Sequence, residues 1–227
     1  MSEVDAPAAA QEPTGPPVPT AEQIDTYTPK EVVEVLHAAV HTSPDINASV
    51  VTMCCKRLRV LCREPENCKR CDRAGTATAV VGAMGALPAV DTVQLQALAA
   101  IVNLCSGEAN EHRKNAVDSG AMKAIVAAMN SLKENAEVQE MACIALQNCC
   151  YGEDPNAIVR RQKAANEGAL EAVVAAMKQF EASGAPRTAA SLHARAVHKW
   201  SRRWWWRSPR ARSPSLYLAR SLVHPPR

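Results

Sequence analysis

The sequence predicts an all-α protein in which about three helical repeats stack into an α-solenoid between disordered ends. Two observations lead to this prediction. The segment GAMKAIVAAMN, which begins at Gly120, returns 48 residues later at Gly168 as GALEAVVAAMK, with seven of eleven positions identical. Apolar residues make up 47% of the chain but aromatic residues only 4%. Such Ala-rich apolar runs favour closely packed helices over sheets.

The first helix is expected to follow a disordered leader over residues 1–28, which contains five Pro residues. The first 29 residues contain no Lys or Arg, so they lack the basic region of a signal or transit peptide. The segment TPKE then predicts a helix start, with Thr28 as N-cap, Pro29 at the first helical position and Glu31 completing a capping box. Ser43 and Pro44 predict a second start of the same kind.

Apolar stripes at helical spacing recur with a period near 45 residues. One stripe follows steps of four, four and three, and the same template fits 45 residues later and 43 residues earlier. The three stripes are Val93, Ala97, Ile101 and Leu104; Val138, Ala142, Leu146 and Cys149; and Val50, Cys54, Leu58 and Leu61. After each comes a polar loop and then a helix that starts at Gly, over 75–84, 120–129 and 168–177. One such unit cannot bury its apolar face alone, so neighbouring units must stack.

In this register the chain resembles armadillo repeats. The resemblance rests on VQEMACIALQNCC followed by NEGALEAVVAAM, and on VQLQALAAIVNLC followed by DSGAMKAIVAAM. It covers about residues 45–182; HEAT repeats, a lesser alternative, lack the Asn and Gly at these positions. The resemblance implies a right-handed superhelix over residues 29–182, with GALEAVVAAM similar to the first two helices of a repeat and EVQEMACIALQNC to the third. It also implies a non-catalytic scaffold whose third helices line a concave groove for an extended peptide or protein partner.

The resemblance places this groove on helices over 91–106 and 136–151. Two Asn residues are expected to bond the partner's backbone, and five neighbours to shape the groove: Asn103 and Asn148, with Gln96, Ala99, Glu140, Ile144 and Gln147. The alternative is that both Asn side chains satisfy backbone groups between stacked repeats. Family members that hold peptides often carry Trp four residues before such an Asn. Here those positions are Ala99 and Ile144, so capture of basic nuclear-import signals is not expected.

No pattern in the sequence predicts an enzyme. Phosphate-binding glycine loops and a nucleophile elbow are lacking. Among nine Cys residues, Cys62, Cys68 and Cys71 form the densest group, with Cys54, Cys55, His37 and His41 upstream. Only one short chelating pair, CKRC, is present, whereas a structural zinc site needs four ligands. We therefore expect packing cysteines, no catalytic residue, no metal and no cofactor.

The C-terminal segment over 183–227 differs sharply in charge from the rest. From Gly184 onward it has nine Arg, one Lys and no acidic residue, whereas residues 1–183 have 16 basic and 23 acidic residues. The middle of this segment could bind nucleic acid or an anionic membrane through a run of Arg and Trp residues, Arg202, Arg203, Trp204, Trp205, Trp206 and Arg207. Two other interpretations stay open: a disordered tail without a partner, and a segment that is not native coding sequence, because it begins where another repeat helix is expected.

The chain has an odd number of Cys residues and lacks a secretory signal. We therefore expect it to lie in a reducing compartment, the cytoplasm or the nucleus. No apolar run approaches the roughly 20 residues that a membrane helix needs. The sequence does not identify the protein partner or the oligomeric state.

Overall fold

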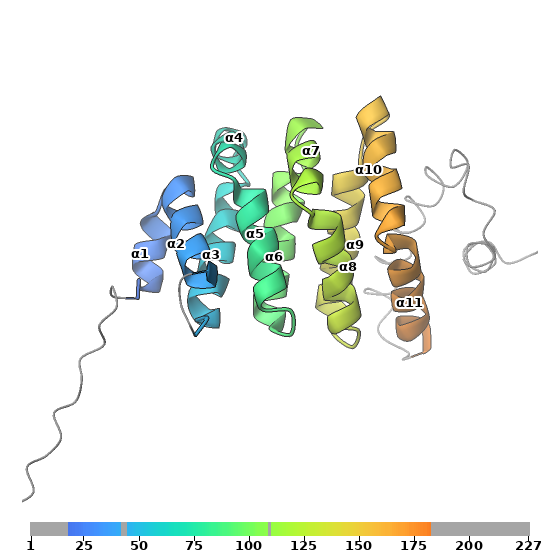
Figure 1. Cartoon of the computed structure of the whole chain (residues 1–227), viewed down its shortest axis with the longest axis horizontal. Coiled ribbons are helices and arrows are strands. Elements are labelled where there is room, and N and C mark those ends of the chain that lie inside the picture. The colour runs from blue at the N-terminus through green and yellow to red at the C-terminus, as the bar shows by residue number, and fades with distance from the viewer. Residues whose placement is uncertain (1–17, 42–44, 109, 183–227) are drawn as a thin grey trace, which may run out of the picture.

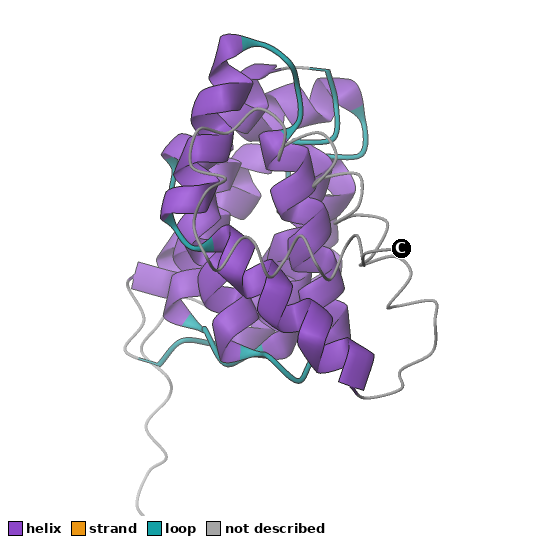
Figure 2. Cartoon of the chain, turned by 90° about the vertical axis from the view of Figure 1, so that its right-hand side faces the viewer, coloured by secondary structure: helices purple, strands orange, loops and turns teal. Residues whose placement is uncertain are grey.

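The computed structural model describes residues 18–41, 45–108 and 110–182, and within these ranges the chain forms eleven α-helices and no strand (Figure 1, Figure 2). The all-α prediction is therefore confirmed. No helix in the described ranges is long and apolar enough to cross a membrane. In chain order the helices are α1 (Ala21–Thr26), α2 (Pro29–His41), α3 (Ala48–Leu61), α4 (Pro65–Arg73), α5 (Thr76–Ala86), α6 (Asp91–Leu104), α7 (Asn110–Asp118), α8 (Ala121–Ser131), α9 (Ala136–Cys150), α10 (Pro155–Asn166) and α11 (Ala169–Ala182).

The helices pack in three rows that advance together from one end of the molecule to the other (Figure 1). Helices α3, α6 and α9 pack one on the next, and so do α2, α5, α8 and α11. The third row is α4, α7 and α10, which follow one another along the upper edge in Figure 1. Each helix thus packs on its equivalent in the neighbouring unit, which is why similar side chains recur about every 45 residues.

Local capping explains where most helices begin. The Thr28 backbone N–H donates to Glu31 Oε2 over 2.7 Å, so the predicted capping box is confirmed. Gly75, Gly120 and Gly168 precede α5, α8 and α11 with φ of 81°, 91° and 83°, a left-handed conformation that side chains disfavour. The start predicted at Ser43 and Pro44 lies outside the described residues, and no helix continues from it, because residues 45–47 are not helical. Helix α3 instead begins after Asn47, whose Oδ1 accepts the N–H groups of Ser49 and Val50.

The loops expected between the repeated helices are themselves largely helical. Each contains one helix, α4, α7 or α10, so a unit has three helices, the number that the resemblance implied, rather than two helices and a polar loop. The assignment of GALEAVVAAM to two helices is wrong, because all of this segment after Gly168 lies in the single helix α11. Polar composition concealed α4, α7 and α10: each buries only two to four residues, too few for a stripe of apolar residues to stand out.

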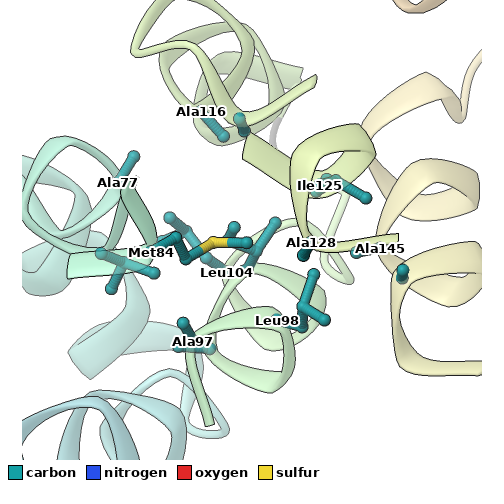
Figure 3. Packing of buried hydrophobic residues seen from close by; sticks show 14 of the residues in the cluster. Ala77, Met84, Ala97, Leu98, Leu104, Ala116, Ile125, Ala128 and Ala145 are labelled. Carbon is teal, nitrogen blue, oxygen red and sulfur yellow. The ribbon is translucent and has the colours of Figure 1, made fainter. Parts of the chain in front are cut away.

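The three predicted stripes are buried, and small side chains fill the seams between helices. All twelve stripe residues belong to one core cluster, and this cluster includes Ala residues on many of the helices. Figure 3 labels Ala77, Ala97, Ala116, Ala128 and Ala145 among them. Because Ala projects only a methyl group, helices carrying it can approach closely.

The ends of the chain differ from the predicted boundaries. The disordered leader predicted for residues 1–28 is too long, because α1 begins at Ala21 and buries Ile24. At the other end, Val174 and Met177 of α11 are partly exposed, whereas their equivalents Val126 and Met129 of α8 are buried beneath the next unit. The predicted tail and the helix expected after α11 lie outside the described residues.

Candidate functional site

The predicted groove residues lie on α6 and α9, which pack side by side, and α3 continues the same row. Ala99 is buried and offers little surface, whereas the other predicted residues are partly exposed. The 43-residue offset from Ala99 leads to Lys56 of α3, and Arg59 lies one turn after Lys56. Glu137 of α9 lies one turn before Glu140. We call the following set the row face: Lys56, Arg59, Gln96, Asn103, Glu137, Glu140, Ile144, Gln147 and Asn148.

Asn103 and Asn148 tie each helix of the row to the one before it. Asn103 Nδ2 donates to the Arg59 carbonyl over 2.8 Å, and Asn148 Nδ2 donates to the Val102 carbonyl over 3.0 Å. These bonds match the alternative in which Asn connects stacked repeats. The Oδ1 atom of each accepts no hydrogen bond from the residues that the structure describes.

Two further polar atoms on the row face are buried and unpaired within the described residues. They are Arg59 Nε and Gln96 Oε1. A buried donor or acceptor ordinarily has a hydrogen-bond partner, so each such atom needs an explanation. Charge also changes along the face, from Lys56 and Arg59 on α3 to Glu137 and Glu140 on α9.

A buried pair of Gln residues makes identical contacts in two units. Gln94 Nε2 donates to the carbonyls of Met84 and Leu87 over 2.9 and 3.0 Å. Gln139, 45 residues later, donates to the equivalent carbonyls of Met129 and Leu132 over 2.8 and 3.0 Å. These carbonyls lie at the ends of α5 and α8, where intrahelical donors run out. No sequence pattern predicted a role for these two Gln residues, although the pair VQ recurs at both places.

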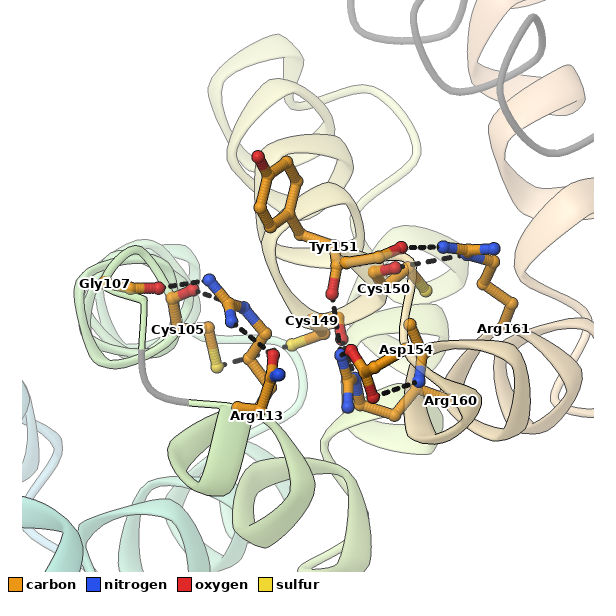
Figure 4. Close-up of polar contacts among 12 residues, drawn as sticks. Cys105, Gly107, Arg113, Cys149, Cys150, Tyr151, Asp154, Arg160 and Arg161 are labelled. Atoms are coloured by element: carbon orange, nitrogen blue, oxygen red, sulfur yellow. Dashed lines mark hydrogen bonds and ion pairs between the residues drawn. The ribbon is translucent and has the colours of Figure 1, made fainter.

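Buried Arg side chains hold the ends of α6 and α9 (Figure 4). Arg113 Nε donates to the Cys105 carbonyl over 3.1 Å, and Arg160 Nε donates to the Cys149 carbonyl over 2.8 Å. Arg160 Nη2 also donates to the Tyr151 carbonyl over 2.6 Å. Charged donors thereby satisfy carbonyls that the helices leave unpaired. Neither Arg was predicted, because its target lies on another helix.

The thiols fall into two groups by environment. Burial raises the pKa values of Cys54, Cys143 and Cys150 to about 12, which suits the predicted packing role. Cys62, Cys68 and Cys71 instead interact with one another, and Cys68 Sγ lies 3.5 Å from Nδ1 of His112. His112 comes from α7 of the next unit and was not among the predicted ligands. Within the described residues, no three His, Cys, Asp or Glu side chains are placed to hold a metal ion.

Comparison with known proteins adds no family assignment. No protein-family model matches the chain, and no curated protein matches it. The residues proposed for tail binding, Arg202, Arg203, Trp204, Trp205, Trp206 and Arg207, lie outside the described residues.

Proposed function

We propose that the chain is an armadillo-like solenoid that binds an extended peptide or protein segment across the row face, as a non-catalytic scaffold. The observation that carries this proposal is the row itself: α3, α6 and α9 pack in succession and place equivalent, partly exposed side chains at a regular interval. An extended chain also presents backbone groups at a regular interval, so a repeating row suits it.

The repeated contacts support the solenoid part of the proposal. Residues about 45 positions apart serve the same structural purpose: Gln94 and Gln139 bond equivalent carbonyls, and Asn103 and Asn148 each join neighbouring helices. A globular helical bundle has no reason to keep such an interval, whereas stacked repeats do.

The two roles considered for the Asn side chains are compatible. Each amide nitrogen is used inside the row, and each amide oxygen stays open to the N–H group of a bound chain. Gln96 Oε1 and Arg59 Nε are buried and unpaired within the described residues, so a bound chain would reach them only after these side chains rotate outward. Ile144 contributes partly exposed apolar surface between these polar groups. A partner with basic residues against Glu137 and Glu140 is favoured, because opposite charges steer association and fix orientation.

The test is a peptide selection followed by charge reversal. Peptides selected from a random library for binding the full chain are measured on two variants, Glu140→Lys on the row face and Glu171→Lys on α11. Both variants change the net charge equally. We expect Glu140→Lys to weaken binding by about tenfold, or about 1.4 kcal/mol, and Glu171→Lys to leave it unchanged. Equal affinities for the two variants would remove the row face from the proposal.

Alanine at both Asn103 and Asn148 tests the polar contacts of the same face. We expect weaker peptide binding without unfolding. Because each change also removes a bond between helices, the denaturation midpoint must be measured beside the affinity.

The basic tail supports a second candidate function, binding of nucleic acid or an anionic membrane. Its supporting observation is ten basic residues, no acidic residue and four Trp after Gly184. Binding of single-stranded DNA by the full chain should then weaken steeply with salt and be lost when Trp204, Trp205 and Trp206 become Ala. DNA binding that survives these changes would reject the tail as the binding segment.

A further inference from the structure

Three thiols meet where the end of α3 turns into α4. Cys62 follows the last residue of α3, and Cys68 and Cys71 lie one turn apart on α4. From the neighbouring unit, His112 of α7 places Nδ1 3.5 Å from Cys68 Sγ. The carbonyl of Leu104 lies 3.7 Å from the same sulfur.

His112 is held in place from its other side. Its Nε2 atom lies 4.0 Å from Asp72 Oδ2, and Asn115 Nδ2 donates to the same carboxylate oxygen over 2.9 Å. The side chains of His112 and Asp72 are about nine-tenths buried. Cys68, His112 and Asp72 therefore form a fixed chain of neighbours that joins α4 to α7. Such an arrangement orients an imidazole toward a thiol.

The cluster separates the acidities of its members. The pKa of Cys68 is lowered to about 7, because hydrogen bonding with the Cys62 thiol and, after it, the neighbouring His112 outweigh the opposing effect of burial. The same Cys62 thiol lowers the pKa of Cys71, while the pKa of Cys62 itself is raised. In the reduced cluster Cys62 therefore keeps its proton, and Cys68 carries a larger thiolate share than Cys62 does. The remaining charged neighbour, Asp72, acts weakly in the opposite direction.

From this cluster we infer that Cys68 is a site of oxidation by hydroperoxides and that Cys62 is the thiol that resolves it into a disulfide. In the first step the Cys68 thiolate attacks one oxygen of hydrogen peroxide. An S–O bond forms, the O–O bond breaks, and hydroxide leaves, so sulfur is oxidised to sulfenic acid and the peroxide is reduced. In the second step Cys62, which no longer faces a Cys68 thiolate, gives its proton to the hydroxide released in the first step, forming water, and attacks Cys68 as a thiolate. The S–S bond forms, the S–O bond breaks, and hydroxide leaves.

Cys62 is the resolving thiol because it is the shared neighbour of the other two. The Cys62 thiol lowers the pKa values of both Cys68 and Cys71, whereas Cys68 acts on Cys71 only through charge. The disulfide removes the thiolate that faces His112. Oxidation therefore breaks a contact between neighbouring units while tying the end of α3 to α4.

Cys143 is a matched internal control for burial. Cys68 is 7% exposed and Cys143 is 6% exposed. Burial raises the pKa of Cys143 to about 12, and no other thiol contributes to that shift. At neutral pH the larger thiolate share of Cys68 outweighs its lower intrinsic nucleophilicity, so Cys68 should react at least ~100-fold faster.

The experiment treats the reduced full chain with hydrogen peroxide, blocks remaining thiols with N-ethylmaleimide, and digests the protein without reduction. Trypsin cleaves after Arg59, Arg63, Lys69, Arg70 and Arg73, so Cys62, Cys68 and Cys71 fall on three separate peptides. We expect a linked pair that contains Cys62 and Cys68, formed while Cys143 remains a free thiol. Far-UV circular dichroism during the reaction checks that the helices persist.

A Cys62→Ser variant separates the two steps. It should accumulate sulfenic acid at Cys68, which dimedone labels, and form no disulfide at that peptide. The inference is overturned if Cys68 in the unmodified chain is oxidised no faster than Cys143, or if its disulfide partner is Cys71. Oxidation of all thiols together with loss of helix would equally overturn it, because the reaction would then follow unfolding.

Discussion

Arg160 offers the sharpest test of how the units are held together. Its guanidinium is buried and donates to the carbonyls of Cys149 and Tyr151 over 2.8 and 2.6 Å, with Asp154 Oδ2 3.8 Å away. Arg160→Met keeps much of the aliphatic volume but removes both donors. Each charged hydrogen bond contributes about 1.5–3 kcal/mol. Relief from burying a charge offsets part of that loss, so we expect a net destabilisation of about 3 kcal/mol.

The matched control is Lys163→Met on the same helix. Lys163 also carries one positive charge and lies 2.6 Å from Asp118, but the two side chains are 47% and 43% exposed. Exposed ion pairs contribute about 0–1 kcal/mol. In urea denaturation followed by circular dichroism, a slope of about 2 kcal/mol/M gives a midpoint shift of about 1.5 M for Arg160→Met and at most about 0.5 M for Lys163→Met. Equal shifts would refute the idea that Arg160 secures the end of α9.

Three further predictions concern backbone conformation, pH and the buried amide. Gly75→Ala should destabilise the protein by about 1–2 kcal/mol, because the φ of Gly75 is 81°. Gly85→Ala within α5 should stabilise it by about 0.5–1 kcal/mol, because nothing lies within 4 Å of the added methyl group. Urea midpoints that shift in the same direction for both variants would contradict this. Lys163 holds the pKa of Asp118 below its ordinary value of 3.8. The stability that this ion pair adds is therefore present above pH 3.8 and is lost as the pH falls through the lowered pKa. Asp118→Asn should flatten the dependence of the urea midpoint on pH below about 4, and an unchanged dependence would exclude this contribution. Gln139→Leu leaves two carbonyls at the end of α8 without a donor and should destabilise by about 1–3 kcal/mol in the same assay; a midpoint within error of the unmodified chain would show that the amide is dispensable.

The sequence predicted the parts of the fold that depend on spacing within one helix. The stripe that begins at Val93 is buried as expected, and the glycines at 75, 120 and 168 start helices with positive φ. These features depend on the period of an α-helix and on the conformational freedom of glycine. Both can be read from a single segment without knowing what packs against it.

The parts that escaped prediction depend on side chains reaching from one helix to another. Arg160 and the carbonyl of Cys149 are eleven residues apart, and Cys68 and His112 are 44 residues apart. No local period connects such residues, so their meeting depends on the way the units stack. Helix α7 was not predicted for a related reason. Its few buried residues include His112 and Arg113, and a search for apolar periodicity does not count these residue types.

The thiol cluster occupies the place where the first unit departs from the pattern of the next two. In the second and third units a buried Arg bonds the carbonyl at the end of the long helix, eight or eleven residues after Cys105 or Cys149. The same spacings after Cys62 lead to Arg70 and Arg73, and both are exposed. In their place the first unit buries Cys68 and Cys71, which interact with Cys62. A local departure from a pattern that the chain otherwise keeps is where a role beyond packing is expected. Within the repeat domain, this departure makes the junction of α3 and α4 the strongest candidate for chemistry of its own.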